Sequence, residues 1–149
     1  MKIIVVSGGF DPIHVGHIRL LKEAKALGDK LIAVVNNDEF LTRKKGFVFM
    51  PFDQRQEVLE SVRYVDEVFG SPDKDDSVCE SLRLLRKAHP KDKMVFANGG
   101  DRENAQSIRE SSACADLDIE MVFGVGGTDK PQSSSWLTNS IRRRRLASD

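Results

Sequence analysis

The chain has 149 residues, of which 40% are hydrophobic and 31% are charged, the balance of an ordinary soluble globular protein. Its 23 Lys and Arg residues equal its 23 Asp and Glu residues, so the net charge is zero and a dedicated nucleic-acid-binding protein is not expected. No apolar run approaches the roughly 20 residues that a membrane span needs, and the N-terminus lacks the apolar stretch of a secretory signal. We therefore expect a single cytoplasmic domain over residues 1–149 that does not bind a membrane.

Short apolar runs alternate with segments of helical periodicity along the chain. In chain order, the predicted elements are strand 2–7, helix 17–28, strand 30–36, helix 51–62, strand 65–69, helix 76–90, strand 93–98, helix 102–117, strand 119–125 and helix 135–147. Gly28 is placed to end the first helix, and Asp53 is the candidate N-cap of the second. This alternation predicts a Rossmann-like α/β fold: a doubly wound parallel sheet of about five strands with helices on both faces.

Paired glycines follow three of the predicted strands, as Gly8-Gly9, Gly99-Gly100 and Gly126-Gly127. In open α/β sheets, ligands bind outside the carboxyl ends of the strands. A glycine has no side chain to keep a ligand away from the backbone. The sequence therefore predicts a ligand site at this edge of the sheet.

Residues 7–17, SGGFDPIHVGH, hold two of the three histidines of the chain. Pro12 disfavours a helical conformation for the residue before it, so the next helix is expected to begin near residues 15 and 16. The first turn of a helix leaves N–H groups unpaired and carries a partial positive charge. His14 and His17 flank this start and can both donate to one anion. Bare backbone, a helix N-terminus and two imidazoles thus converge where a phosphate would sit.

A metal site is the alternative interpretation of the two histidines. Histidines at positions i and i+3 can bind zinc, but no third Cys, His or paired carboxylate stands nearby in the sequence. Cys79 and Cys114 stand alone, without CxxC spacing. We therefore expect no metal site built from protein side chains alone.

The stretch GGFDPIHVGH (8–17) resembles the HxGH signature of the cytidylyltransferase-like nucleotidyltransferase superfamily. HIRLLKEAKALGDKLIAVVNNDEF (17–40) and RQEVLESVRYVDEV (55–68) are similar to its glycerol-3-phosphate cytidylyltransferase and heptose 1-phosphate adenylyltransferase branches. FANGGDR (96–102) resembles the second nucleotide-binding loop, and SSSWL (133–137) resembles the C-terminal Ser/Thr motif.

The resemblance implies nucleotidyl transfer. A phosphate oxygen of a small phosphomonoester would attack the α-phosphorus of a nucleoside triphosphate, and pyrophosphate would leave. His14 and His17 would bind the α-phosphate oxygens as these gain charge, and Lys44 would neutralise phosphate as well. Mg²⁺ would enter with the triphosphate, with Asp11 as the nearest carboxylate.

The resemblance also implies sets of nucleotide-binding and acceptor-binding residues. Arg55 and Arg63 match family positions expected to bind the phosphate of the acceptor, although surface ion pairs with nearby glutamates are the alternative. Family members often carry a basic residue where this chain has Thr138, so we expect the phosphate clamp at the serines to be weaker or displaced. The implied nucleotide-binding residues are Gly8, Gly9, Phe10, Asp11, Gly16, Gly99, Gly100, Asp101, Ser133, Ser134 and Ser135.

The identities of the nucleotide and the acceptor stay open at this point. Cytidylyltransferases of the superfamily usually carry an Arg-Thr-x-Gly-Ile segment where this chain has VGGTDKPQSSS (125–135), so CTP is less favoured than the signature alone suggests, and both ATP and CTP remain candidates. The acceptor could be a sugar phosphate, glycerol 3-phosphate or, as in FAD synthetase-like adenylyltransferases, FMN; the polar loop 71–77 could cover it.

A non-catalytic nucleotide sensor of the same fold is the alternative from another class. Homodimers are common in these branches, but the sequence does not fix an oligomeric state.

Overall fold

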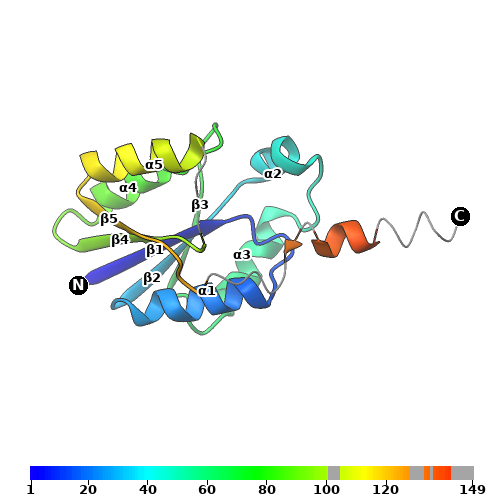
Figure 1. Cartoon of the computed structure of the whole chain (residues 1–149), viewed down its shortest axis with the longest axis horizontal. Coiled ribbons are helices and arrows are strands. Elements are labelled where there is room, and N and C mark those ends of the chain that lie inside the picture. The colour runs from blue at the N-terminus through cyan, green and yellow to red at the C-terminus, as the bar shows by residue number, and fades with distance from the viewer. Residues whose placement is uncertain (101–104, 128–132, 135, 142–149) are drawn as a thin grey trace, which may run out of the picture.

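The computed structural model describes residues 1–100, 105–127, 133, 134 and 136–141 (Figure 1). Within these ranges its helices and strands are β1 (Lys2–Gly8), α1 (Val15–Ala26), β2 (Lys30–Val35), α2 (Asp38–Lys45), α3 (Phe52–Glu60), β3 (Glu67–Gly70), α4 (Cys79–Ala88), β4 (Lys93–Ala97), α5 (Ala105–Asp116) and β5 (Ile119–Val122). Residues 134 and 136–141 are also helical, which agrees with the start of the predicted closing helix; its predicted end lies outside the described residues.

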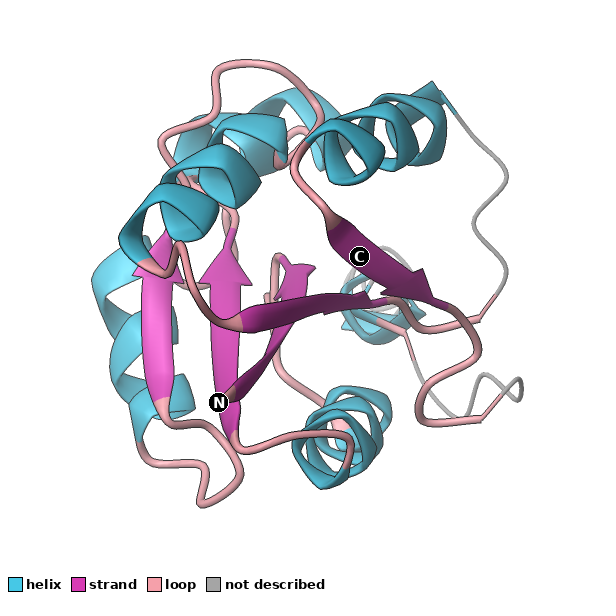
Figure 2. Ribbon diagram, turned by 90° about the vertical axis from the view of Figure 1, so that its left-hand side faces the viewer, coloured by secondary structure: helices cyan, strands magenta, loops and turns pink. Residues whose placement is uncertain are grey.

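The five strands form one all-parallel sheet in the order β3-β2-β1-β4-β5. Helices α4 and α5 cover one face of this sheet, while α1 and α3 cover the other (Figures 1 and 2). The predicted doubly wound α/β fold is therefore confirmed. Strand order changes direction between β1 and β4, so the chain leaves the carboxyl ends of these two neighbouring strands toward opposite faces.

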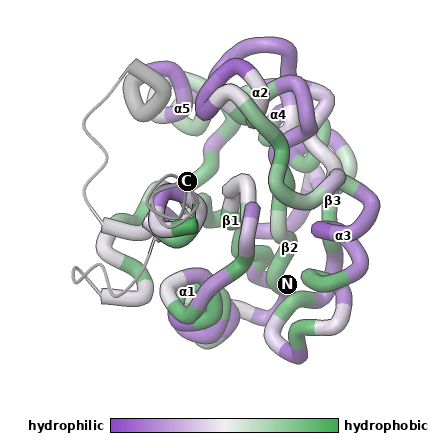
Figure 3. Tube along the Cα trace, turned by 90° about the vertical axis from the view of Figure 1, so that its right-hand side faces the viewer, coloured by the Kyte–Doolittle hydropathy of each residue, from purple (hydrophilic) through white to green (hydrophobic). Residues whose placement is uncertain are grey.

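The sheet is apolar on both faces because helices cover both. Residues Ile3 to Val6 of β1 are fully buried, and their side chains alternate between the two faces. Ile3 and Val5 pack with α4 and α5, in the cluster that also contains Leu82 and Cys114. Ile4 and Val6 pack in the cluster that contains Leu21 of α1 and Leu59 of α3. Figure 3 shows apolar segments gathered inside the molecule and hydrophilic segments around it.

The short helix α2 is absent from the predicted elements. Its side-chain cap is Asn37, whose Oδ1 accepts the N–H of Phe40 at 2.8 Å. Gly46 ends it with a φ of 84°, a left-handed conformation that favours glycine. Lys44 consequently lies in the last turn of a helix, whereas the sequence placed it in a basic loop.

At the start of α3 and at the end of α1, the structure gives a different physical explanation from the one predicted from the sequence. Pro51 is the N-cap of α3 and Asp53 lies in its first turn, so the prediction that Asp53 is the N-cap is wrong. Gly28 does follow the last residues of α1, but its φ is not left-handed. A Cβ at Gly28 would lie 2.8 Å from the carbonyl oxygen of Lys2, so close approach of β1 explains the glycine. Among the described residues, no helix is long and apolar enough to cross a membrane.

Candidate active site

The loop between β1 and α1 lies at the carboxyl edge of the sheet and is fixed by a buried aromatic ring. Phe10 has a left-handed φ of 52°, and its side chain is 2% exposed within the cluster beside α1. Its ring centroid lies 4.8 Å from that of His17. The predicted nucleotide-binding residue Phe10 therefore packs against a predicted catalytic imidazole and holds the loop in shape.

His14 and His17 cap the start of α1 together. His14 is the N-cap, and its Nδ1 accepts the N–H of Gly16 at 3.1 Å. In return, Nδ1 of His17 accepts the N–H of His14 at 3.2 Å, which completes a reciprocal capping box. Because both Nδ1 atoms accept, each neutral imidazole carries its proton on Nε2. The helix start thus fixes the tautomer of both rings and makes each Nε2 a hydrogen-bond donor.

The two imidazoles are stacked, with centroids 3.8 Å apart and an interplanar angle of 27°. Burial, followed by the proximity of His14, lowers the pKa of His17 from 6.5 to about 3. Two stacked cations would repel each other in this poorly solvated position, so His17 is neutral at neutral pH. It therefore acts as a fixed N–H donor.

Asp11 holds the loop that precedes α3. Its carboxylate is almost fully buried at 1% exposure and accepts the N–H groups of Phe49 and Met50. Nζ of Lys45 lies 3.1 Å from the Asp11 carboxylate and also donates to the Asp11 carbonyl oxygen at 2.6 Å. Both carboxylate oxygens are thus engaged by this chain. The expectation that Asp11 helps to hold Mg²⁺ does not fit this arrangement.

Arg55 is buried and acts within the fold. Its side chain has no exposed surface, and its guanidinium donates to carbonyl oxygens of Gly9, Asn36 and Met50 at 2.7 to 2.9 Å. It also forms an ion pair with Asp38 at 2.7 Å. The prediction that Arg55 binds the acceptor phosphate is therefore replaced by a positioning role. The sequence alternative of a surface ion pair with a glutamate is not formed either.

Arg63 lies at the opposite edge of the sheet. It stands between the end of α3 and the start of β3, where Asp66 donates its N–H to the carbonyl of Leu31 at the start of β2. Its exposed guanidinium donates to the hydroxyl of Tyr64 at 2.9 Å. Within one copy of the chain, Arg63 is not brought to the histidine pair, and its role in acceptor binding stays a prediction.

The C-terminal serines meet the loop before α1. The hydroxyl of Ser134 donates to the carbonyl oxygen of Pro12 at 2.7 Å. The hydroxyl of Ser133 accepts the N–H of Trp136 at 3.4 Å, the pattern of a helix cap. The hydroxyl of Thr138, at the position where family members often have a basic residue, donates to the Ser134 carbonyl at 3.0 Å. The predicted residues Ser135 and Asp101 lie outside the described residues.

The glycine pairs after β4 and β5 form a joined surface beside α1. The N–H of Gly124 donates to the Gly100 carbonyl at 3.3 Å, and the N–H of Gly126 donates to the carboxylate of Glu23 at 2.7 Å. A Cβ at Gly126 would lie 3.0 Å from backbone atoms of Leu20, at a φ of 86°. The predicted residues Gly99 and Gly100 therefore adjoin a loop that packs on the middle of α1, at Leu20.

Two cavities flank the sheet at its opposite edges. One of about 490 Å³ lies beside the Asp11 loop, and it is lined by Lys45, Gly46, Phe47, Phe49, Thr138 and Ile141. Lys44 lies on the neighbouring turn, with Nζ 5.5 Å from the ring centroid of Phe40. Phosphate binding by Lys44 stays a prediction.

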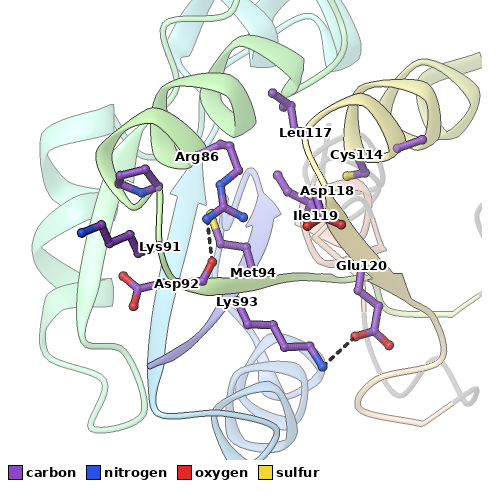
Figure 4. A pocket seen from close by; sticks show the side chains of 12 residues that line it. Arg86, Lys91, Asp92, Lys93, Met94, Cys114, Leu117, Asp118, Ile119 and Glu120 are labelled. Atoms are coloured by element: carbon purple, nitrogen blue, oxygen red, sulfur yellow. Dashed lines mark hydrogen bonds and ion pairs between the residues drawn. The ribbon is translucent and has the colours of Figure 1, made fainter.

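The other cavity, of about 660 Å³, lies at the amino edge (Figure 4). Two of its charged groups, Lys93 and Glu120, form an ion pair at 3.8 Å. Burial raises the pKa of the Cys114 thiol in its lining to about 12, so this thiol is not a nucleophile at neutral pH. The chemistry of the molecule is therefore concentrated at the carboxyl edge.

Lys45 lies beside the candidate site and was missed by sequence reasoning. In the sequence, Lys45 is only the second of two adjacent lysines. In the structure, its side chain differs from that of Lys44 because it forms an ion pair with Asp11. Among the described residues, no group of three or more potential metal-binding side chains is found.

Comparison with known proteins agrees with this geometry. Residues 5–140 match the model of the cytidylyltransferase-like family. The FAD synthase of Pyrococcus abyssi is 39% identical over 122 residues, which cover 80% of this chain and 77% of that protein. The glycerol-3-phosphate cytidylyltransferase of Bacillus subtilis is 44% identical over 68 residues, which cover 46% of this chain and 53% of that protein. A lipopolysaccharide core biosynthesis protein of Thermoplasma volcanium has the same fold, with a TM-score of 0.64 at 24% identity over 83% of this chain and 93% of that one.

Arg55 is buried and Arg63 is exposed, although the sequence predicted the same role for both. Replacing Arg55 by Met leaves three carbonyl groups without their donor, so we expect the free energy of unfolding to fall by about 3–5 kcal/mol. Arg63→Met, at the exposed position, is the matched control and should change it by no more than about 0.5 kcal/mol. Urea unfolding monitored by circular dichroism measures both values. Equal effects of the two substitutions would contradict the positioning role of Arg55.

The lowered pKa of His17 makes stability depend on pH. The unfolded chain takes up a proton on this residue as the pH falls through 6.5, whereas the folded chain does not do so until about pH 3. Stability is therefore lost as the pH falls across this window, by at most about 1.4 kcal/mol per pH unit for this one proton. We expect His17→Asn, whose Oδ1 can still accept the N–H of His14, to reduce the slope between pH 6.5 and 4.5. Urea titrations at several pH values measure it, and an unchanged slope would exclude this origin.

Proposed function

The chain belongs to the cytidylyltransferase-like family and is a nucleotidyltransferase, and from that premise we propose that residues 1–149 act as one domain that transfers a nucleoside monophosphate to a small phosphomonoester. A phosphate oxygen of the acceptor attacks the α-phosphorus of the triphosphate. The bond from this phosphorus to the bridging oxygen breaks, and pyrophosphate leaves with the electron pair.

One observation carries this proposal: the stacked imidazoles of His14 and His17 at the start of α1. Their Nδ1 atoms are occupied by backbone N–H groups, so both rings offer Nε2–H donors held by the helix itself. The α-phosphate oxygens gain charge during in-line transfer, and preorganised donors at a helix N-terminus stabilise that charge. A neutral His17 needs no protonation step before it can act.

We propose ATP as the nucleotide. FAD synthases match 80% of this chain, whereas the glycerol-3-phosphate cytidylyltransferases match 46% and 52% of it and an ethanolamine-phosphate cytidylyltransferase matches 73%. The Arg-Thr-x-Gly-Ile segment typical of cytidylyltransferases is also missing. In this proposal the base and ribose lie over Gly99, Gly100 and Asp101, while the serines at 133–135 receive the β- and γ-phosphates. Mg²⁺ enters as part of the substrate complex with the triphosphate, where it neutralises phosphate charge.

FMN is the acceptor that two observations support. The FAD synthases match 80% and 81% of the chain, a larger share than the cytidylyltransferases among its relatives match. Beside the Asp11 loop, the cavity of about 490 Å³ is lined by Phe47 and Phe49, and the Phe49 side chain is 48% exposed. Aromatic side chains of this kind suit a flat ring system. Glycerol 3-phosphate with CTP is the second candidate, supported by the similarity of part of the chain to the Bacillus subtilis enzyme.

Pyrophosphate release tests the reaction. ATP and CTP are each combined with FMN, glycerol 3-phosphate and a panel of sugar phosphates, and we expect release with ATP and FMN that stops when Mg²⁺ is removed with EDTA. Release only with CTP and glycerol 3-phosphate would select the second candidate. No release with any pair would favour a nucleotide sensor.

His17→Asn tests the mechanism. Because it removes an N–H donor used mainly in the transition state, turnover should fall by about 10²- to 10⁴-fold. His89→Asn is the matched control, since His89 lies at the amino edge beside Asp92. Steady-state kinetics of both variants, with circular dichroism to verify folding, gives the comparison. Full turnover in a folded His17→Asn variant would contradict the mechanism.

A further inference from the structure

Two adjacent asparagines follow β2, and within the described residues only the second forms hydrogen bonds through its side chain. Oδ1 of Asn37 accepts from Phe40, and its Nδ2 donates to the carbonyl oxygens of Ser71 and Asp73 at 3.2 and 3.0 Å. Asn36 is 8% exposed, yet among the residues that the structure describes its side-chain amide makes no hydrogen bond. A buried amide without a partner destabilises a fold, and a ligand that bonds to it would remove this cost.

The backbone fixes where Asn36 stands. Its N–H donates to the carbonyl of Gly8 at 2.9 Å, which extends the β1–β2 ladder by one residue. Its own carbonyl accepts from Arg55 at 2.7 Å. Side chains alternate along a strand, so Asn36 falls on the same face as Ile32 and Val34, the face covered by α4 and α5. It therefore stands at the carboxyl edge on the face opposite α1.

Ser7 and Asn98 stand near the carboxyl ends of the next two strands, with Ser7 level with Val34, two residues before Asn36. Ser7 follows Ile3 and Val5 on the same face of β1, and its hydroxyl makes no hydrogen bond within the described part of the chain. Asn98 is 3% exposed, and its amide nitrogen makes only two contacts at 3.4 Å, the outer limit of a hydrogen bond. Val5 and Phe96 form the last printed pair between β1 and β4, and Ser7 and Asn98 each follow this pair by two residues.

These three side chains are uncharged and can both donate and accept hydrogen bonds. Such groups suit hydroxyl and carbonyl oxygens, whereas the imidazoles and the helix start suit phosphate. In-line transfer places the attacking and leaving oxygens on opposite sides of the phosphorus. With the leaving pyrophosphate beside α1 and the serines, as the proposed function has it, the acceptor approaches from the face of Ser7, Asn36 and Asn98.

We propose that Asn36, together with Ser7 and Asn98, forms a subsite that binds the neutral hydroxyl or carbonyl groups of the phosphorylated acceptor. This inference rests on the proposed function for the identity of its occupant. Asn36 makes it specific for acceptors that carry such groups close to their phosphate.

The test replaces Asn36 by Leu, which has nearly the same shape but no polar atoms, and by Ala as a smaller second variant. We expect kcat/KM for the acceptor to fall about tenfold or more, with the KM for the triphosphate within about twofold of the wild-type value. The thermal midpoint of Asn36→Leu should equal or exceed that of the wild type, because an unpaired amide is removed. Asn37→Ala is the matched control for stability: it loses three hydrogen bonds, so its midpoint should fall.

Three results would overturn the subsite: an unchanged kcat/KM for the acceptor in folded Asn36 variants, an equal loss for the triphosphate, or a fall in midpoint as large as that of Asn37→Ala. Calorimetric titration with FMN, glycerol 3-phosphate and inorganic phosphate separates this inference from the reaction. Weaker binding of the two organic phosphates by Asn36→Leu, with inorganic phosphate unaffected, supports the subsite even without turnover. A wild-type chain that binds these phosphates but releases no pyrophosphate contradicts the proposed function alone.

Discussion

The buried guanidinium of Arg55 is the interaction on which the carboxyl edge depends. It joins the end of β1 at Gly9, the end of β2 at Asn36, the loop before α3 at Met50 and the first turn of α2 at Asp38. A planar group with several fixed donors can bind diverging carbonyl oxygens at once, which a lysine cannot do. Because those carbonyl oxygens belong to segments that also shape the site, the positions of the loops around the imidazoles follow from the placement of this side chain.

The charged side chains described at this edge mainly bind one another and backbone groups, and so stabilise the fold. Asp11 and Lys45 pair with each other and with backbone groups, as Arg55 does with Asp38 and three carbonyl groups. The groups assigned to the transferring phosphate are instead neutral imidazoles, whose tautomer is set by the helix start. A neutral donor can be buried beside a second one at far smaller cost than a cation, and it gains strength as the phosphate oxygens become more negative.

Local patterns in the sequence predicted most of the fold and the centre of the site. Strand and helix periodicity is local, so the alternation and the parallel sheet followed from it, and the spacing of His14 and His17 marked the helix start. The contacts of Arg55 and Asp11 are with partners far apart in sequence, which local spacing does not reveal. Asn36 and Asn37 show the limit most clearly: the residues are identical and adjacent, and only their tertiary surroundings distinguish an amide with three partners from one without any among the described residues.

The strand order brings side chains from both faces of the sheet to the same edge. After β1 the chain turns to the face of α1, whereas after β3 and β4 it turns to the face of α4 and α5, so side chains from both faces border the same short edge. A displacement at phosphorus has an entering and a leaving side. The face of α1 supplies a helix start and imidazoles, and the other face supplies amides and a hydroxyl. In the proposed reaction, the switch in strand order would therefore place two chemically different sets of side chains on either side of the phosphorus, with the nucleotide on one side and the acceptor on the other.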